Sequence, residues 1–144
     1  MSISWVQGAV SYIAASRHRI FPFFVVGGSA FIINWGLFKL FRVVGLSTPL
    51  LVNLALILSI EISILYNFVF QYLWTWKDSE RLRGRALFFK CLTFHGAVGV
   101  GALVRLILFP VGQVFDLQDD LNFVIGVAVA TVLDFVLYDK LVFR

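Results

Sequence analysis

The stretch LALILSIEISILYNF, Leu54 to Phe68, decides the fold class of this protein. It is a nearly continuous run of Leu, Ile and other apolar residues with a single acid, Glu61, close to its middle. A soluble amphipathic helix places its acids on a broad polar face, and the residues around Glu61 are too apolar to form one. The run therefore predicts a helix that crosses a lipid bilayer.

The composition of the whole chain agrees with this prediction. Of its 144 residues, 60% are hydrophobic and only 14% are charged, whereas soluble domains have about 25% charged residues. The formal net charge is +4, but the basic residues flank apolar spans. This arrangement predicts contact with anionic lipids of the inner leaflet and no binding of nucleic acid.

The polar residues form no recognisable enzyme or metal motif. Cys91 is the single cysteine, and His18 and His95 are far apart, so neither a disulfide nor a Cys/His metal site is expected. The sequence has no Gly-rich phosphate loop, nucleophile elbow or acid–base pair, and its loops are too short for a nucleotide-sugar domain. We therefore expect no cofactor and no enzymatic activity.

The apolar segments are long enough for an all-α, polytopic membrane protein. A helix that crosses the hydrocarbon layer needs about 20 mostly apolar residues. Four segments qualify, at about 20–41, 50–74, 88–111 and 121–143. They predict four transmembrane helices arranged as two tandem hairpins, a transmembrane domain over residues 20–144, and short interfacial helices beside them.

Residues 1–19 predict a separate amphipathic segment that lies in the membrane interface. Trp5, Ala9, Tyr12 and Ile13 recur at helical spacing, and the basic residues follow this apolar stretch, unlike those of a secretory signal. The alternative is a disordered tail.

The loop charges predict how the chain is oriented. Basic residues precede the first span and crowd residues 77–90, while Asp116, Asp119 and Asp120 stand without a base between the last two spans. By the positive-inside rule, both termini and the middle loop are cytoplasmic, which predicts a multi-pass protein of the inner (cytoplasmic) membrane. Residues 78–90 also suggest a basic interfacial helix, unless their charges only set the orientation.

The ends of the second and fourth spans resemble each other. YNFVFQYLWTW, from Tyr66, aligns with LDFVLYDKLVF, from Leu133, and places Asn67 opposite Asp134. FVVGGSA in the first span and TFHGAVG in the third form a weaker pair. Two hairpins in tandem would be a parallel repeat about an axis along the membrane normal. Chance similarity between apolar sequences is the alternative.

Charged residues inside the spans are the first candidates for a functional site. With a rise of about 1.5 Å per residue, Glu61 lies near the bilayer middle, Arg105 in the outer half and Asp134 below the middle. A charge at the bilayer centre costs about 2.5–3.5 kcal/mol on insertion scales, so these side chains should face protein or a hydrated cavity. Either Glu61 and Arg105 form a salt bridge, or Arg105 meets an anionic headgroup while Glu61 balances charge or titrates.

Small residues lead to two of these charges along their helices, which predicts that both charges face helix–helix contacts. Small residues at a spacing of four let membrane helices approach closely. The stripes are Ala97, Gly101 and Arg105 in the third span and Gly126, Ala130 and Asp134 in the fourth, with Gly27 and Gly28 expected to serve the first span in the same way.

Three stretches together resemble a known family. FFVVGGSAFIINWGLF in the first span, NFVFQYLWTWK closing the second and DFVLYDKLVF closing the fourth resemble the GtrA-like family of small four-helix membrane proteins, over about 21–143. The resemblance implies a flippase, which translocates a polyprenyl-phosphate-linked sugar across the cytoplasmic membrane for cell-surface polysaccharide or lipopolysaccharide modification. A membrane glycosyltransferase is the implied partner, and the alternative role is a non-transporting scaffold or anchor for such an enzyme.

A lipid-linked sugar suits the polar residues of the spans. Arg105 can pair with two phosphate oxygens, and Lys90 can collect the headgroup from the inner leaflet. Four helices leave little room for such a cavity, so a homo-oligomer is expected. The sugar hydroxyls would be bound by Asn34, Asn67, Glu61 and Asp134, and a sugar face would stack on Trp35 or Trp74.

A proton-coupled drug exporter of similar size is a third hypothesis. Such exporters carry their acid in the first helix, where this chain has Asn34. The position of Glu61, in the second span, therefore argues against this hypothesis.

Overall fold

A computed structural model describes the backbone of residues 2–46 and 48–143. It also describes their side chains, except those of residues 2–6, 9, 10, 49, 109, 119, 120 and 123. Every regular element in the described part is a helix, so the predicted all-α class is confirmed.

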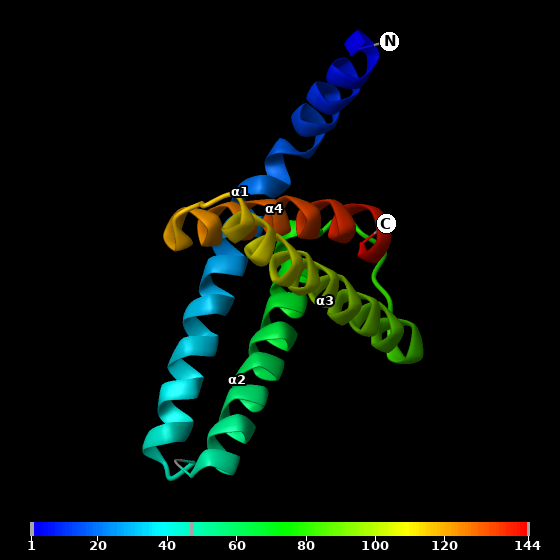
Figure 1. Cartoon of the computed structure of the whole chain (residues 1–144). Coiled ribbons are helices and arrows are strands. Elements are labelled where there is room, and N and C mark those ends of the chain that lie inside the picture. Colours follow the sequence, from blue (N-terminus) through cyan, green and yellow to red (C-terminus); the bar gives the residue numbers. More distant parts are fainter. Residues whose placement is uncertain (1, 47, 144) are drawn as a thin grey trace. The chain divides into compact units, whose positions relative to one another are not determined.

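The helices form two hairpins. Helix α1 (Ser2–Val43) packs on α2 (Pro49–Phe70), and α3 (Gly84–Val114) packs on α4 (Asp119–Leu137) (Figure 1). A short π-helix extends each second helix: η1 (Gln71–Thr75) follows α2, and η2 (Tyr138–Val142) follows α4. The chain divides into two compact units, Met1–Lys77 and Asp78–Arg144, so each hairpin is a unit with its own core.

The helices are long enough for the predicted spans. Within the described residues, three segments can cross a membrane by length and composition, namely Ser11–Val43, Leu50–Thr75 and Gly84–Val114. Helix α4 and η2 together occupy the fourth predicted span. The protein is thus a helical, polytopic membrane protein.

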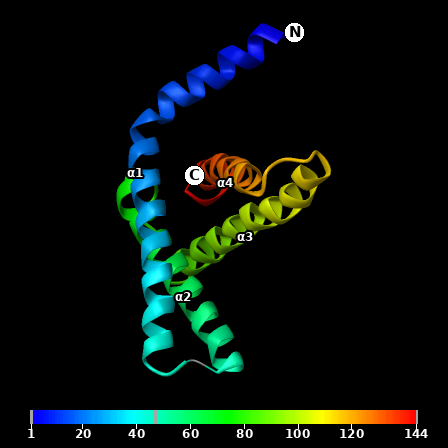
Figure 2. The same cartoon turned by 60° about the vertical axis from the view of Figure 1, so that its left-hand side comes forward.

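The N-terminal segment is helical and continuous with the first span. Both views show α1 changing direction in its N-terminal part (Figures 1 and 2), and Pro22 lies inside this helix. Proline lacks a backbone N–H and clashes with the carbonyl one turn earlier, which bends a helix there. The side chains of Trp5 and Ala9 lie outside the described residues, so the amphipathic face and the division at residue 19 stay predictions.

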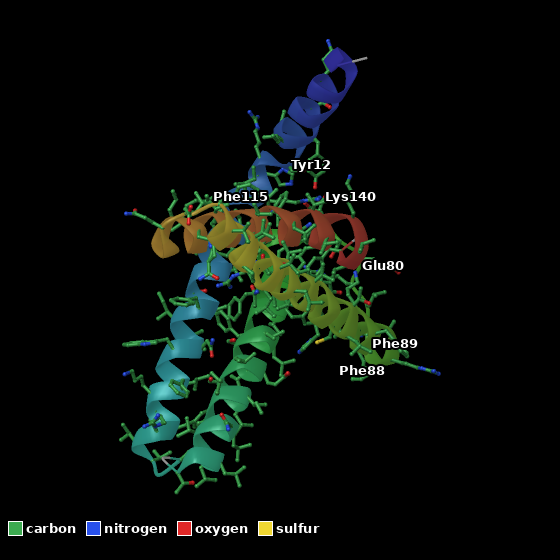
Figure 3. All side chains as sticks on the ribbon, viewed as in Figure 1. Tyr12, Glu80, Phe88, Phe89, Phe115 and Lys140 are labelled. Atoms are coloured by element: carbon green, nitrogen blue, oxygen red, sulfur yellow. The ribbon has the colours of Figure 1, made fainter. Side chains whose placement is uncertain are left out.

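The helix predicted over residues 78–90 forms only from Gly84 onward, as the beginning of α3. Residues 77–83 contain no helix, and Gly84, with φ of 56°, begins α3 in the left-handed conformation that glycine adopts easily. Arg85 lies 5.5 Å over the ring of Phe89 in the first turns of α3. Figure 3 shows Phe88 and Phe89 projecting from this end of the helix. The basic segment is therefore irregular up to residue 83, and its second part is the start of a spanning helix.

The two hairpins are structural repeats. In η1 the N–H of Trp76 donates to the carbonyl of Gln71 at 2.8 Å, and in η2 the N–H of Phe143 donates to that of Tyr138 at 2.9 Å. Both bonds span five residues, the spacing of a π-helix. The residue pairs are separated by the same 67 positions as Asn67 and Asp134, which confirms the predicted repeat in this part of the chain.

The buried positions follow the same register. Three pairs of buried residues in the first helices correspond with a shift of 71: Phe23 with Phe94, Val26 with Ala97, and Ala30 with Gly101. Six pairs in the second helices and π-helices correspond with a shift of 67: Ala55 with Asn122, Ser59 with Gly126, Ser63 with Ala130, Gln71 with Tyr138, Thr75 with Val142, and Trp76 with Phe143. The two hairpins thus bury equivalent faces.

The core of each hairpin is an aromatic cluster at the π-helix. In the first hairpin, the rings of Phe23 and Trp76 meet edge to face at 6.2 Å. In the second, the ring of Phe94 lies 4.4 Å from that of Tyr138 and 6.0 Å from that of Phe143. The extra residue of each π-helix turns the last aromatic back onto the first helix of its hairpin.

The burial register corrects two predictions for the first span. The alignment of FVVGGSA with TFHGAVG pairs Gly27 with Gly96, which is a shift of 69 and two residues out of the structural register. A Cβ atom on Gly27 or Gly28 would meet nothing within 4 Å among the described residues, so these glycines mediate no close helix contact within their hairpin. Val26 and Ala30 occupy the buried face instead.

Candidate functional site

The second hairpin places Asp134 in a tight contact with α3. A Cβ atom on Gly101 would collide with the carboxylate of Asp134, so only glycine allows that side chain its position. Ala97 and Ala130, one turn away on the two helices, are both buried. Ala97, Gly101 and Ala130 of the predicted stripes therefore lie where α3 and α4 meet, and Asp134 lies there too, whereas a Cβ atom on Gly126 would meet nothing within 4 Å.

Arg105 follows Gly101 by one turn on α3. Its side chain is exposed, which differs from the prediction that both charges face helix contacts. Its guanidinium is near enough to act electrostatically on the carboxylate of Asp134. Within the described residues, Oδ1 of Asp134 is buried and accepts no hydrogen bond. The hairpin thus combines an exposed guanidinium with a carboxylate whose Oδ1 is buried against Gly101.

Glu61 lies on α2 in the other hairpin, with an exposed side chain. The predicted alternatives for Glu61, a salt bridge with Arg105 or a titrating acid in a cavity, stay predictions. What the structure adds is that Arg105 already has an acidic neighbour, Asp134, within its own hairpin.

Two asparagines supply the polar atoms of the first hairpin. Asn34 on α1 and Asn67 on α2 are half-buried, and the Oδ1 atom of each is buried with no hydrogen-bond partner in the described part of the chain. Near Asn67, the hydroxyls of Ser29 and Tyr66 lie 3.2 Å apart and join α1 to α2. These side chains can exchange hydrogen bonds with hydroxyl groups but carry no charge.

Trp35 lies on the surface of the first hairpin. It is 60% exposed, and Nζ of Lys39 lies 5.8 Å over its ring. This contact lets Lys39 rest its charge on an aromatic face. The role of Trp35 in stacking a sugar stays a prediction.

Lys90 is built into the aromatic cluster of the second hairpin. It is only 9% exposed, and its Nζ lies 5.8 Å over the ring of Phe143. The charge of Glu80, labelled in Figure 3 in the segment before α3, also acts on Lys90. At about 1.5 Å per residue, Lys90 and Arg105 are about 22 Å apart along α3, so they do not form one site. These contacts suit a packing role for Lys90 better than the predicted capture of headgroups.

Sequence reasoning missed two buried polar residues. Gln71 is fully buried, and its Nε2 donates to the carbonyl of Phe23 at 3.3 Å while its Oε1 accepts from the hydroxyl of Thr75. Asn122 is 3% exposed and packs where a Cβ atom on Gly112 would stand.

The fold and the polar interface define a class, namely small helical membrane proteins built from two repeated hairpins. Residues 22–143 match the family described as "GtrA/DPMS, transmembrane domain", and the chain belongs to this family. The predicted GtrA-like resemblance is thereby confirmed.

One curated relative is an enzyme. Over 91 residues, the chain is 38% identical to a dolichol-phosphate mannosyltransferase from Pyrococcus furiosus. The match covers 63% of this chain and 24% of that enzyme, so the chain corresponds to only a minor part of its relative.

Proposed function

We propose that this protein translocates a polyprenyl-phosphate-linked sugar across the cytoplasmic membrane. The observation that carries the proposal is the buried, unpartnered oxygen of Asp134, held against Gly101 beside the exposed Arg105. The family and the mannosyltransferase relative support the same class of lipid. Both termini of the chain would be cytoplasmic, and the process served would be cell-surface polysaccharide biosynthesis.

Each part of such a lipid needs a different environment. The polyprenyl tail can stay in the hydrocarbon layer, so only the phosphate and the sugar need polar partners during the crossing. A guanidinium can pair with two phosphate oxygens, which suits Arg105. A carboxylate oxygen accepts hydrogen bonds from sugar hydroxyls, which suits Asp134. No bond of the lipid has to break, so we propose a transporter and no catalytic activity.

Leaflet transfer in vesicles tests this proposal. The purified protein is reconstituted with tritium-labelled dolichyl-phosphate mannose, and an impermeant oxidant of vicinal hydroxyls reports which sugars reach the outer leaflet. Arg105→Gln should reduce the transfer rate by about tenfold, because a charge-assisted hydrogen bond contributes about 1.5–3 kcal/mol. Arg85→Gln is the matched control, because Arg85 lies at the start of the same helix over Phe89. Wild-type transfer no faster than in empty vesicles, with insertion verified, would exclude translocation.

A scaffold for a glycosyltransferase is the second candidate. It is favoured by the relative itself, because a protein named as a mannosyltransferase contains a region similar to this chain within a longer sequence. A scaffold should keep both its complex with a partner enzyme and its surface phenotype in the double variant Arg105→Gln, Asp134→Leu. Co-purification and cell-surface glycan analysis distinguish the two roles, since a translocase variant keeps the complex and loses the phenotype.

A further inference from the structure

The end of α1 that precedes the turn to α2 carries two bases over aromatic rings. Nζ of Lys39 lies 5.8 Å from the ring centre of Trp35, and Cζ of Arg42 lies 6.0 Å from that of Phe38. Residues three, four and seven positions apart share one face of a helix, so these four side chains form a single row. We call this row the cationic stripe.

The cationic stripe is accessible and lies at the end of a membrane span. Trp35 is 60% exposed, and Lys39 and Arg42 are exposed as well, so the stripe takes no part in the packing of α1 on α2. The first spanning segment ends at Val43, one residue after Arg42. Long basic side chains at the end of a span reach the lipid headgroups while their stems stay in apolar surroundings.

The bases of the stripe are not part of the repeated design of the hairpins. With the shift of 71 between the first helices, Trp35, Lys39 and Arg42 correspond to Leu106, Pro110 and Gln113. The second hairpin therefore buries equivalent positions without any base at this end of its first helix. Closing a hairpin of this kind does not require the charge of the stripe.

The orientation of the chain does not require these bases either. The basic residues of segment 77–83 follow η1, so they lie at the opposite end of α2 from the turn that joins it to α1. The positive-inside rule predicts few bases at the end away from that segment. Residues 35–60 nevertheless contain two bases and no acid, so this end of the hairpin attracts anions.

We propose that the cationic stripe binds the anionic phosphate of a membrane lipid in the leaflet opposite segment 77–83. The guanidinium of Arg42 pairs with two phosphate oxygens, and the ammonium of Lys39, three residues before it on the same face, adds a second positive charge. The rings of Trp35 and Phe38 lie beneath the two bases and belong to the kind of side chain that collects at the headgroup level. This inference goes beyond the proposed function and does not depend on it, because binding of a lipid phosphate requires no leaflet transfer.

Quenching of tryptophan fluorescence by brominated lipids tests this inference, because bromine quenches the tryptophans that it approaches. The substitutions Trp5→Phe and Trp74→Phe leave Trp35 as the reporter, since Trp76 is only 1% exposed and is shielded from lipid. This reporter protein is placed in phosphatidylcholine vesicles that contain increasing fractions of brominated phosphatidylglycerol or brominated phosphatidylcholine. Phosphatidylglycerol should bind beside Trp35 about fivefold more strongly than phosphatidylcholine, the size expected for one base near an anionic lipid.

The variant Lys39→Gln, Arg42→Gln of the reporter protein should lower this ratio of affinities to about one. Arg85→Gln is the matched control, because Arg85 also lies over an aromatic ring, but at the start of α3. It should leave the ratio at Trp35 unchanged.

Two results would overturn the inference. One is a ratio of about one in the reporter protein, and the other is a ratio that stays at about fivefold in the Lys39→Gln, Arg42→Gln variant. Neither result bears on translocation, which is measured separately as leaflet transfer. Conversely, a protein that moves no lipid-linked sugar can still bind a lipid phosphate at the stripe.

Discussion

At the scale of single residues, the absence of a side chain at Gly101 matters for the site as much as the charged residues do. Gly101 gives the carboxylate of Asp134 its place against α3, whereas Gly99, two positions earlier, faces open space. Gln71, fully buried, joins η1 to α1 through the carbonyl of Phe23. Gly101 and Gly99 therefore look alike in the sequence, but only Gly101 makes room for another side chain.

Substitution of Gly101 should displace Asp134. In Gly101→Ala the new Cβ atom occupies the place of the carboxylate, and overpacking of this kind costs about 1–3 kcal/mol of stability. We expect slower leaflet transfer and a lower unfolding midpoint in a thermal melt. Gly99→Ala, the control, should match the wild type in both measurements, and equal behaviour of the two variants would contradict the contact.

Substitution of Gln71 should loosen the first hairpin. Gln71→Leu leaves the hydroxyl of Thr75 without the oxygen that accepts its hydrogen bond. A buried polar group that loses its partner costs about 1–3 kcal/mol, so the variant should unfold at a lower denaturant concentration. Gln113→Leu changes an exposed glutamine of the same size and should have no such effect. If both variants unfold alike, Gln71 has no structural role of this kind.

At the scale of elements, the π-helices decide how each hairpin closes. A π-helix carries one residue more than the α-helical turn it replaces, so the residues after it are rotated relative to a continuous α-helix. In both hairpins this rotation brings the last aromatic residue, Trp76 or Phe143, onto the phenylalanine of the first helix. Because both hairpins contain a π-helix at this position, we infer that the π-helix is needed to form the aromatic core.

Removal of one residue from η1 tests the role of the π-helix. Deletion of Leu73, which is exposed, should convert η1 to an α-helix and rotate Trp76 by about 100° away from Phe23. The deletion variant should lose the core contact and melt at a clearly lower temperature. Leu73→Ala removes the same side chain without changing the register and should melt like the wild type. A melt unchanged by the deletion would show that the register does not matter.

At the scale of the whole molecule, two hairpins of one design carry different charges. The acidic loop before α4 and the basic segment before α3 lie at opposite ends of α3. The positive-inside rule predicts that the basic segment is cytoplasmic and that the acidic loop lies on the other side of the membrane.

Single cysteines can test this orientation, because Cys91 is the one natural cysteine of the chain. In a Cys91→Ser background, Asp116→Cys should react with an impermeant maleimide added to intact cells. Glu80→Cys should react only after the membrane is opened. The reverse pattern of labelling would invert the predicted topology.

The sequence by itself determined the class of protein, the approximate spans and the repeat between the ends of α2 and α4. These features depend on composition along the chain, because the cost of placing a segment in lipid is nearly a sum over its residues. The resemblance to the GtrA-like family was also readable, because its aromatic helix ends are local in sequence.

Only the tertiary structure decided which faces of the helices meet. Spanning helices are apolar all round, so no polar stripe indicates the buried side, and Gly27 and Gly28 looked as suitable as Gly101. The choice of Val26 and Ala30 for that side, and the position of Asp134 against Gly101, follow from the pairing of helices within each hairpin. That pairing depends on how the side chains of two helices fit together in space, and the order of residues along the chain does not show this fit.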